Sequence, residues 1–225
     1  MMTFLATQTD RLMLGKLFPL EILGVYAVAI ALAEMPRQLI QNISRKVIFP
    51  IIAKFQDLPR KQLREKISKK RWLLLIGMAF VVSMVVGFGD LLILALYDNR
   101  YKDAAWMLPI LSLGMWPGLL VITNTTVLMA IGKPIYASIG NFVKFIYMFI
   151  GVKLGFYLMG FLGVIIVIAC NDLPVYAVVI YGLWEEKLSG IWQDFVTTIF
   201  MCLLIFCIIL CRHFIGFELS ASSLL

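Results

Sequence analysis

The residues that most enzymes use for catalysis are scarce in this chain. It has one histidine, His213, and it shows no serine–histidine arrangement, no glycine-rich phosphate loop and no paired carboxylates in an exposed loop. The four cysteines, Cys170, Cys202, Cys207 and Cys211, have no second Cys/His pair that would complete a zinc site. The sequence therefore predicts a protein that is not an enzyme and that needs no cofactor or metal.

Charge is also scarce, whereas apolar residues are abundant. Charged residues make up 15% of the chain, 62% of the residues are hydrophobic and the mean hydropathy is +0.95. A soluble domain is about 45–50% apolar, so this composition indicates a membrane protein. Only helices and closed barrels span a bilayer, and the apolar segments here are too long and too uniform for barrel strands. We predict an all-α, polytopic transmembrane helical bundle.

Apolar segments follow one another along nearly the whole chain. A helix that crosses the hydrocarbon core needs about twenty mostly apolar residues, and by this measure we predict about seven spans, the first of them incomplete. They lie near 2–18, 22–50, 72–96, 106–131, 134–152, 161–183 and 191–211. We expect residues 1–215 to form one helical lobe and 216–225 a short tail. The spans 72–96 and 191–211 are almost purely apolar, which suits the lipid-facing exterior.

Basic residues predict the orientation. Eight of the twenty lysines and arginines lie between Lys54 and Arg71. Short basic loops mark the cytoplasmic side, so we predict a cytoplasmic loop at about 54–71, a cytoplasmic N-terminus and a multi-pass protein of the plasma (inner) membrane. Residues 59–71 are expected to lie as an amphipathic stretch on the inner surface. A nucleic-acid partner is disfavoured, because spans flank the basic cluster on both sides.

Polar side chains interrupt several spans. Such residues are expensive inside a bilayer, and they indicate a functional site. The candidates for binding a substrate are Arg11, Arg37, Gln41, Asn124, Asn141 and Lys144, and the candidates for ion coupling are Asp10, Glu34 and Asp172. If the spans that carry them pack around a shared water-filled space, that space would satisfy these groups together.

A structural role is the alternative for each of these groups. The adjacent Asp10 and Arg11 are equally well explained as links between helices. Arg37 has a planar guanidinium that suits phosphate, and its alternative partner is Glu34, three residues earlier.

Mid-helix positions raise the same choice. Lys144 lies too far from either end of its helix to reach the interface, and we favour a cavity role over a buried pair with Asp172. Asn171 and Asp172 precede Pro174, which can open the helix locally, as in transporters whose broken helices line a binding site. A kink without ligand contact is the alternative there.

Several motifs resemble those of a known family. The segments 10–15 (DRLMLG) and 23–29 (LGVYAVA) resemble the DR-x-x-L-G and L-G-x-Y-x-x-A signatures of polysaccharide flippases, within the multidrug, oligosaccharidyl-lipid and polysaccharide exporter superfamily. The segments 97–106 (YDNRYKDAAW) and 130–134 (AIGKP) are similar to its outer loop and inner turn, although the glycine usual before the outer-loop tyrosine is absent. The resemblance extends over nearly the whole chain, but it matches only the C-terminal half of the family's two-lobe architecture.

The resemblance implies a function. The substrate would be an oligosaccharide on a polyprenyl-pyrophosphate carrier, exported for surface polysaccharide biosynthesis by two lobes that rock around a central cavity. The basic residues Arg11, Arg37 and Lys144 would hold the pyrophosphate or anionic sugars. The expected partners are the lipid-linked oligosaccharide, membrane lipids and either an N-terminal lobe or a second chain. An ion-coupled multidrug exporter and a half-protein that transports nothing are the alternatives.

Overall fold

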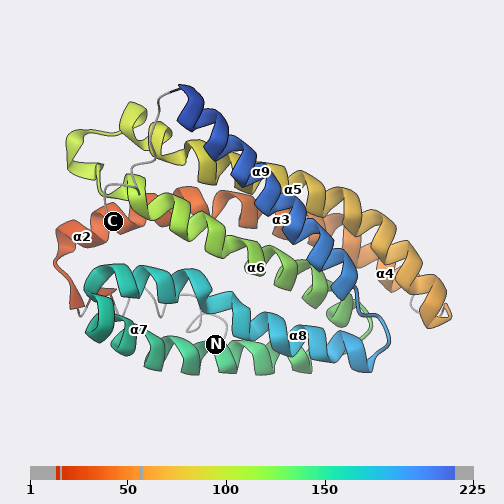
Figure 1. Ribbon diagram of the computed structural model, residues 1–225. Coiled ribbons are helices and arrows are strands. Elements are labelled where there is room, and N and C mark those ends of the chain that lie inside the picture. Colours follow the sequence, from red (N-terminus) through yellow and green to blue (C-terminus); the bar gives the residue numbers. More distant parts are fainter. Residues whose placement is uncertain (1–13, 16, 56–57, 216–225) are drawn as a thin grey trace.

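The structure is a bundle of helices. This computed structural model describes residues 14–215 except 16, 56 and 57, and within these residues every regular element is a helix (Figure 1). The predicted all-α class is confirmed. The elements are α2 (Leu20–Ala33), α3 (Met35–Ile43), the π-helix η1 (Ser44–Ile48), α4 (Phe49–Lys54), α5 (Arg60–Leu96), the 3₁₀ turn η2 (Asn99–Tyr101), α6 (Ala104–Ala130), α7 (Ile135–Ala169), the 3₁₀ turn η3 (Cys170–Asp172), α8 (Leu173–Glu185) and α9 (Ile191–Ile215).

Four helical stretches in the described residues are long and apolar enough to cross a membrane. They are α5, α6, α9 and the run Ile135–Glu185, which joins α7, η3 and α8. This run turns back on itself at Gly160, whose φ of 60° and ψ of −135° are open to glycine and strained for other residues (Figure 1). Its two arms correspond to the predicted spans 134–152 and 161–183, while the total of about seven spans stays a prediction.

Glycines let the two arms of this hairpin approach closely. A Cβ atom on Gly155 would lie 2.8 Å from the carbonyl oxygen of Gly163. A Cβ on Gly140 would lie 2.9 Å from Val175 Cγ1, and one on Gly182 would meet the ring of Tyr136. Because larger side chains at these positions would separate the arms, the glycines position η3 against the helices around it.

The predicted span 22–50 is divided into shorter pieces. Glu34 is a turn residue between α2 and α3, and Pro36 and Pro50 lie at the second positions of α3 and α4. Proline removes a backbone donor and crowds the preceding turn, which interrupts a helix. η1, between α3 and α4, winds as a π-helix, a form that appears mostly as single turns and frequently at functional sites.

The basic segment is helical. α5 has 37 residues and is therefore about 55 Å long, well beyond the roughly 30 Å of the hydrocarbon core. The predicted loop at 54–71 is wrong from Arg60 onward, because these residues form the first turns of α5. The predicted amphipathic stretch at 59–71 is likewise continuous with the span and is not a separate surface segment.

α6 is the central helix of the bundle. It packs against α2, α3, α5, α7 and α8, and 61% of its most apolar window is buried, compared with 17% for α9 (Figure 1). The predicted exterior position of 191–211 therefore agrees with α9. The span 72–96 lies between α6 and α9 and is 44% buried, so it is less exterior than expected.

The links between helices gather at two ends. Glu186 forms ion pairs with Arg60 (3.0 Å) and Lys133 (3.1 Å), which joins the starts of α5, α7 and α9 at one end. Rings of Phe18, Trp106 and Phe161 meet at the other end. The predicted orientation requires these two sets of links to lie at opposite ends of the bundle, as they do. Which end faces the cytoplasm stays a prediction.

Candidate functional site

Three charged residues from three helical segments meet inside the bundle. Arg37 of α3 donates a hydrogen bond from a terminal guanidinium nitrogen to Asp172 Oδ2 at 2.8 Å. Lys144 of α7 donates from Nζ to the other oxygen, Oδ1, also at 2.8 Å. We call Arg37, Lys144 and Asp172 the charged triad. Its side chains are 19%, 8% and 4% exposed, respectively.

Breaks in neighbouring helices create the space for the triad. Asp172 ends the 3₁₀ turn η3, and Pro174 follows at the second position of α8, so the helix direction is interrupted where the carboxylate lies. On α6, Gly118 faces this carboxylate, and a Cβ atom there would lie 2.4 Å from Asp172 Oδ2. Gly114, one turn earlier, allows equally close contact with the backbone of Ala169. The triad thus depends on a broken helix and on two glycines of α6.

Within the described part of the chain, the triad contains two cations and one carboxylate. A cation inside a membrane protein is unfavourable unless a carboxylate, water or another anion compensates it. Arg37 is the most exposed member, and its guanidinium has more donors than its bond to Asp172 uses. The site can therefore attract an anion on the exposed side of Arg37.

A cavity of about 210 Å³ lies between α3, η1, α4, α6, α7 and α8. Five polar residues line it, and we therefore call it the polar cavity although its other walls are apolar; they are Gln41, Arg45, Thr125, Thr126 and Asn141. The hydroxyl oxygen of Thr125 is buried and finds no hydrogen-bond partner among the described residues. Buried polar atoms are normally satisfied, so this hydroxyl is available to a ligand or water. The two predicted residues Gln41 and Asn141 are thereby brought together.

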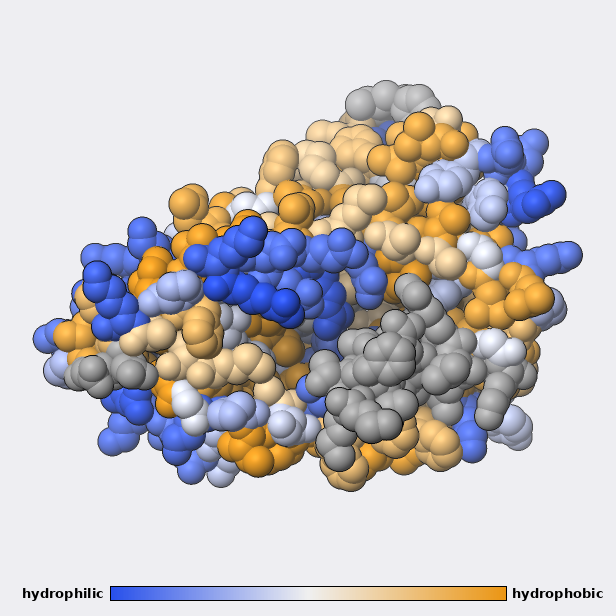
Figure 2. Space-filling model, turned by 180° about the vertical axis from the view of Figure 1, so that it is seen from behind, coloured by the Kyte–Doolittle hydropathy of each residue, from blue (hydrophilic) through white to orange (hydrophobic). Residues whose placement is uncertain are grey.

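Part of the outer face of α3 and η1 is polar, where a membrane protein would normally be apolar. Gln38, Asn42, Arg45 and Lys46 are exposed there, next to the exposed apolar side chains of Leu39, Ile43 and Val47. Figure 2 shows a strongly hydrophilic patch in the middle of the face behind that of Figure 1, where α3 runs, with apolar regions around it. Polar groups at membrane depth are tolerated where they line a water-filled cavity or contact protein. This face is therefore suited to a cavity wall.

The comparison with known families points the same way. Residues 1–106 match the model of a polysaccharide biosynthesis protein family. The match covers slightly less than half of the 225 residues and includes α2, α3 and Arg37. No curated protein and no solved structure matches the chain. The match supports the resemblance to polysaccharide flippases and indicates a role in polysaccharide synthesis or export in the membrane.

The structure places the predicted site residues in different surroundings. Arg37, Lys144 and Asp172 meet, but Lys144 forms the buried pair with Asp172 that the sequence disfavoured, because η3 brings the carboxylate to it. Arg37 pairs with Asp172, and not with Glu34, which is half-buried at the α2–α3 turn. Asp10 and Arg11 lie outside the described residues.

Asn124 belongs to a different network. Its amide nitrogen donates to Asp194 Oδ2 at 3.0 Å, and Tyr176 donates to the same oxygen at 2.8 Å. Arg71 completes the network through its ion pair with Asp194 at 2.6 Å and its bond to Thr123 at 2.9 Å. A structural role in this network is thus an alternative to the predicted substrate role of Asn124. In the printed sequence Arg71 is the last member of the basic cluster, which concealed its burial.

A third charged group joins the two helices expected at the exterior. Arg212 of α9 donates to both oxygens of Asp90 on α5, at 2.6 and 2.9 Å, and to the carbonyl of Gly87. Both side chains are nearly fully buried. Each residue lies near the end of its predicted span, and neither was among the predicted site residues. Among the described residues no cluster of histidine, cysteine and acidic side chains is arranged to hold a metal.

Proposed function

We propose that this chain is a lobe of a flippase that moves a lipid-linked, polyprenyl-pyrophosphate oligosaccharide across the membrane. The observation that carries the proposal is the partly exposed guanidinium of Arg37, which keeps spare donors beside the cavity that Gln41, Arg45 and Asn141 line. A pyrophosphate is a multiply charged anion of two linked phosphate groups with many acceptor oxygens, and Arg and Lys are the usual residues that bind it. The family match over residues 1–106 supports polysaccharide synthesis or export as the biological setting.

The cations would act by exchanging partners. In the structure Asp172 holds both Arg37 and Lys144. A pyrophosphate that enters from the polar face of α3 would offer acceptors to Arg37 and Arg45, since Arg45 lines the adjoining cavity. Gln41 and Asn141 would then donate to the first sugar or to phosphate oxygens. The substrate is moved without covalent chemistry, so these residues bind and release.

A second lobe would cover the polar face. Exposed polar residues on α3 and η1 require water or protein beside them within the membrane. In the proposed cycle, the cavity between this face and the facing surface of the second lobe opens first to one side of the membrane and then to the other. The lipid tail of the substrate stays in the bilayer. Asp172 is the proposed coupling group, because protonating it would release both cations at once.

Complementation of a deletion strain tests the proposal. Without the gene, lipid-linked oligosaccharide should accumulate on the cytoplasmic leaflet, and the wild-type gene should restore surface polysaccharide. Lys144→Gln and Arg37→Gln each remove one cation, while Asp172 keeps the other as a partner. We expect either change to lower export about 10- to 100-fold, as for the loss of one charge-assisted hydrogen bond.

Matched controls are available on exposed ion pairs. Lys133→Gln removes a lysine that is 51% exposed and pairs with Glu186, and export should stay normal. Immunoblots of membranes should show equal amounts of all variants. Normal surface polysaccharide in the deletion strain would overturn the proposal, and so would equal export by the Lys144→Gln and Lys133→Gln variants.

A further inference from the structure

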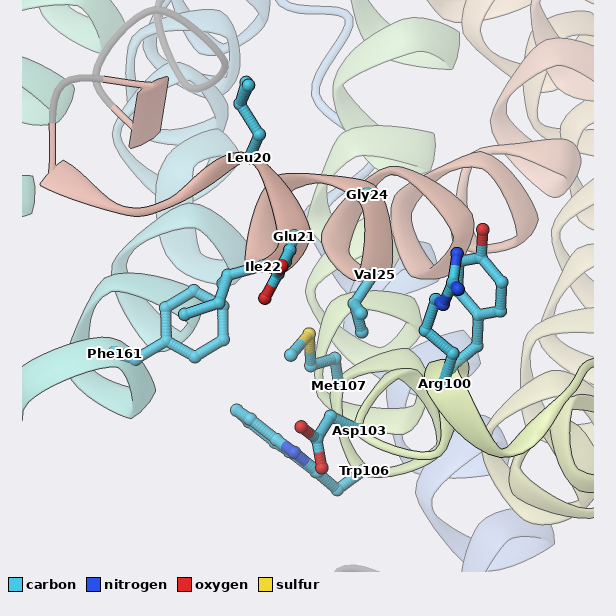
Figure 3. A pocket seen from close by; sticks show the side chains of 11 residues that line it. Leu20, Glu21, Ile22, Gly24, Val25, Arg100, Asp103, Trp106, Met107 and Phe161 are labelled. Atoms are coloured by element: carbon cyan, nitrogen blue, oxygen red, sulfur yellow. The ribbon is translucent and has the colours of Figure 1, made fainter.

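A second, larger cavity lies at the opposite end of the bundle from Arg60, Lys133 and Glu186. Its volume is about 690 Å³, and it is enclosed by the start of α2, the turn η2, the start of α6 and Phe161 of the hairpin (Figure 3). Small-molecule sites typically have volumes of about 300–1,000 Å³ and combine apolar walls with a few polar groups. This cavity has that size and that mixture, and neither the triad nor its polar cavity includes it.

Two carboxylates approach the cavity from opposite walls. Figure 3 shows Glu21 on α2 and Asp103 at the start of α6 with their carboxylates directed into the space between the two helices. Asp103 makes no side-chain cap bond to its own helix. Both side chains are exposed, and among the described residues neither takes part in an ion pair. The cavity therefore has several acceptor atoms that are free to bind hydroxyl donors.

Aromatic rings form the apolar part of the wall. Trp106 is half-buried and meets Phe161 edge to face, with ring centroids 6.0 Å apart, which holds the indole in position. Tyr101 lines the cavity and meets Tyr97 in a second edge-to-face contact at 5.7 Å. Aromatic rings offer a flat, electron-rich face to polarised C–H groups. Arg100 adds hydrogen-bond donors at the rim.

We propose that this cavity is a saccharide-binding site. A sugar ring has hydroxyl groups around its edge and C–H groups on its faces. The hydroxyl groups would donate to Glu21 and Asp103, a ring oxygen or hydroxyl would accept from Arg100, and a C–H face would pack on Trp106. Two carboxylates and one guanidinium give the lining a formal charge of −1, so neutral or amino sugars should bind better than uronic acids.

The site is separate from the proposed pyrophosphate site. Glu21 and Glu34 are thirteen positions apart on and just beyond α2, which corresponds to about 20 Å of helix. A glycan could therefore contact this cavity only through sugars that are remote from the carrier. That the transported glycan reaches this cavity rests on the proposed function. That the cavity binds sugar does not depend on it.

Direct binding to the purified chain tests the proposal. The protein in lipid nanodiscs is titrated with the disaccharides of N-acetylglucosamine, glucose and galacturonic acid, and binding is followed by saturation-transfer NMR. We expect the two neutral disaccharides to bind at least tenfold more tightly than the acidic one. Asp103→Asn and Glu21→Gln should weaken the neutral disaccharides at least tenfold and reduce the discrimination against the acid.

Tryptophan variants provide the matched control. Trp106→Leu should weaken binding at least tenfold, whereas Trp192→Leu, at a 74% exposed position on α9, should leave it unchanged. Circular dichroism measures helicity and so identifies a variant that has not folded. If Trp106→Leu does not fold, the Asp103→Asn and Glu21→Gln variants decide the outcome. The proposal is overturned if no disaccharide binds at millimolar concentration, or if binding is the same in the Trp106→Leu, Asp103→Asn and Trp192→Leu proteins.

This test is independent of the pyrophosphate site. Arg37→Gln should keep full disaccharide affinity while export falls. If export is normal in that variant and disaccharides bind, the proposed function fails and the saccharide site stands. If export falls in that variant and disaccharides do not bind, the saccharide site fails alone.

Discussion

Buried charges are used in two different ways in this molecule. Between α5 and α9, Arg212 pairs with Asp90, one cation for one carboxylate, and both side chains are almost fully buried. Among α3, α7 and η3, two cations share Asp172, and Arg37 remains partly exposed. Counting only described residues, the first group has one cation for its carboxylate and is closed to solvent. The second has two cations for one carboxylate, and the partly exposed Arg37 gives it an open side.

The difference separates structure from function. A balanced, buried pair can be replaced by apolar residues with little loss of stability, although removing one partner is strongly unfavourable. The triad differs in that the partly exposed guanidinium of Arg37 keeps donors that its bond to Asp172 does not use. The Arg71–Asp194 network resembles the first case, since Asn124 and Tyr176 satisfy the second carboxylate oxygen.

The largest effect is expected from Asp172→Asn. The change removes the carboxylate that Arg37 and Lys144 share, and the free energy of unfolding should fall by about 3–5 kcal/mol. Thermal unfolding in detergent measures this. The double variant Asp172→Asn with Lys144→Met removes one of the two cations and should recover part of the loss. Wild-type stability of the single variant would show that water already screens the triad.

The α5–α9 pair should respond differently to a double change. Arg212→Met alone leaves Asp90 as a buried carboxylate without its cation and should also cost about 3–5 kcal/mol, whereas Arg212→Met with Asp90→Leu should return to within roughly 1 kcal/mol of wild type. Export should be normal in the double variant. The corresponding apolar replacement of the triad, at positions 37, 144 and 172, should give a folded protein that does not export.

The contrast also shows what sequence patterns can predict. The apolar segments predicted α5 from Trp72 onward, α6, both arms of the hairpin and α9, because lipid and the buried core both require long apolar helices. The stretch 22–50 was predicted as one continuous span, because its composition is apolar enough to cross a membrane even with Pro36 and Pro50. In the structure the prolines and the π-helix η1 divide it into shorter helices.

Pairing of charges was harder to predict than their presence. Arg37, Lys144 and Asp172 stand out because each interrupts an apolar segment, but their meeting depends on Gly118 and η3, which only the folded chain brings together. Asp90 and Arg212 were overlooked because they lie near helix ends. Their separation of 122 residues carries no local signal.

Gly118 offers a test of intermediate size. Gly118→Ala would place a methyl group 2.4 Å from Asp172 Oδ2, so the carboxylate or α6 must move. We expect a loss of about 1–3 kcal/mol in stability, as for an overpacked core, together with lower export. The control is Gly77→Ala on α5, where nothing lies within 4 Å of the new atom. That change should be neutral or stabilising by up to about 1 kcal/mol.

The smallest effect is expected where both partners reach water. Arg60 is 42% exposed in its pair with Glu186, which also binds Lys133, so Arg60→Gln should change the free energy of unfolding by only about 0–1 kcal/mol. Added salt should reduce even this difference, because exposed charges are screened. A loss as large as that of Asp172→Asn would mean that exposure does not distinguish the ion pairs of this bundle. The partial exposure of Arg37 would then no longer single out the triad as a binding site.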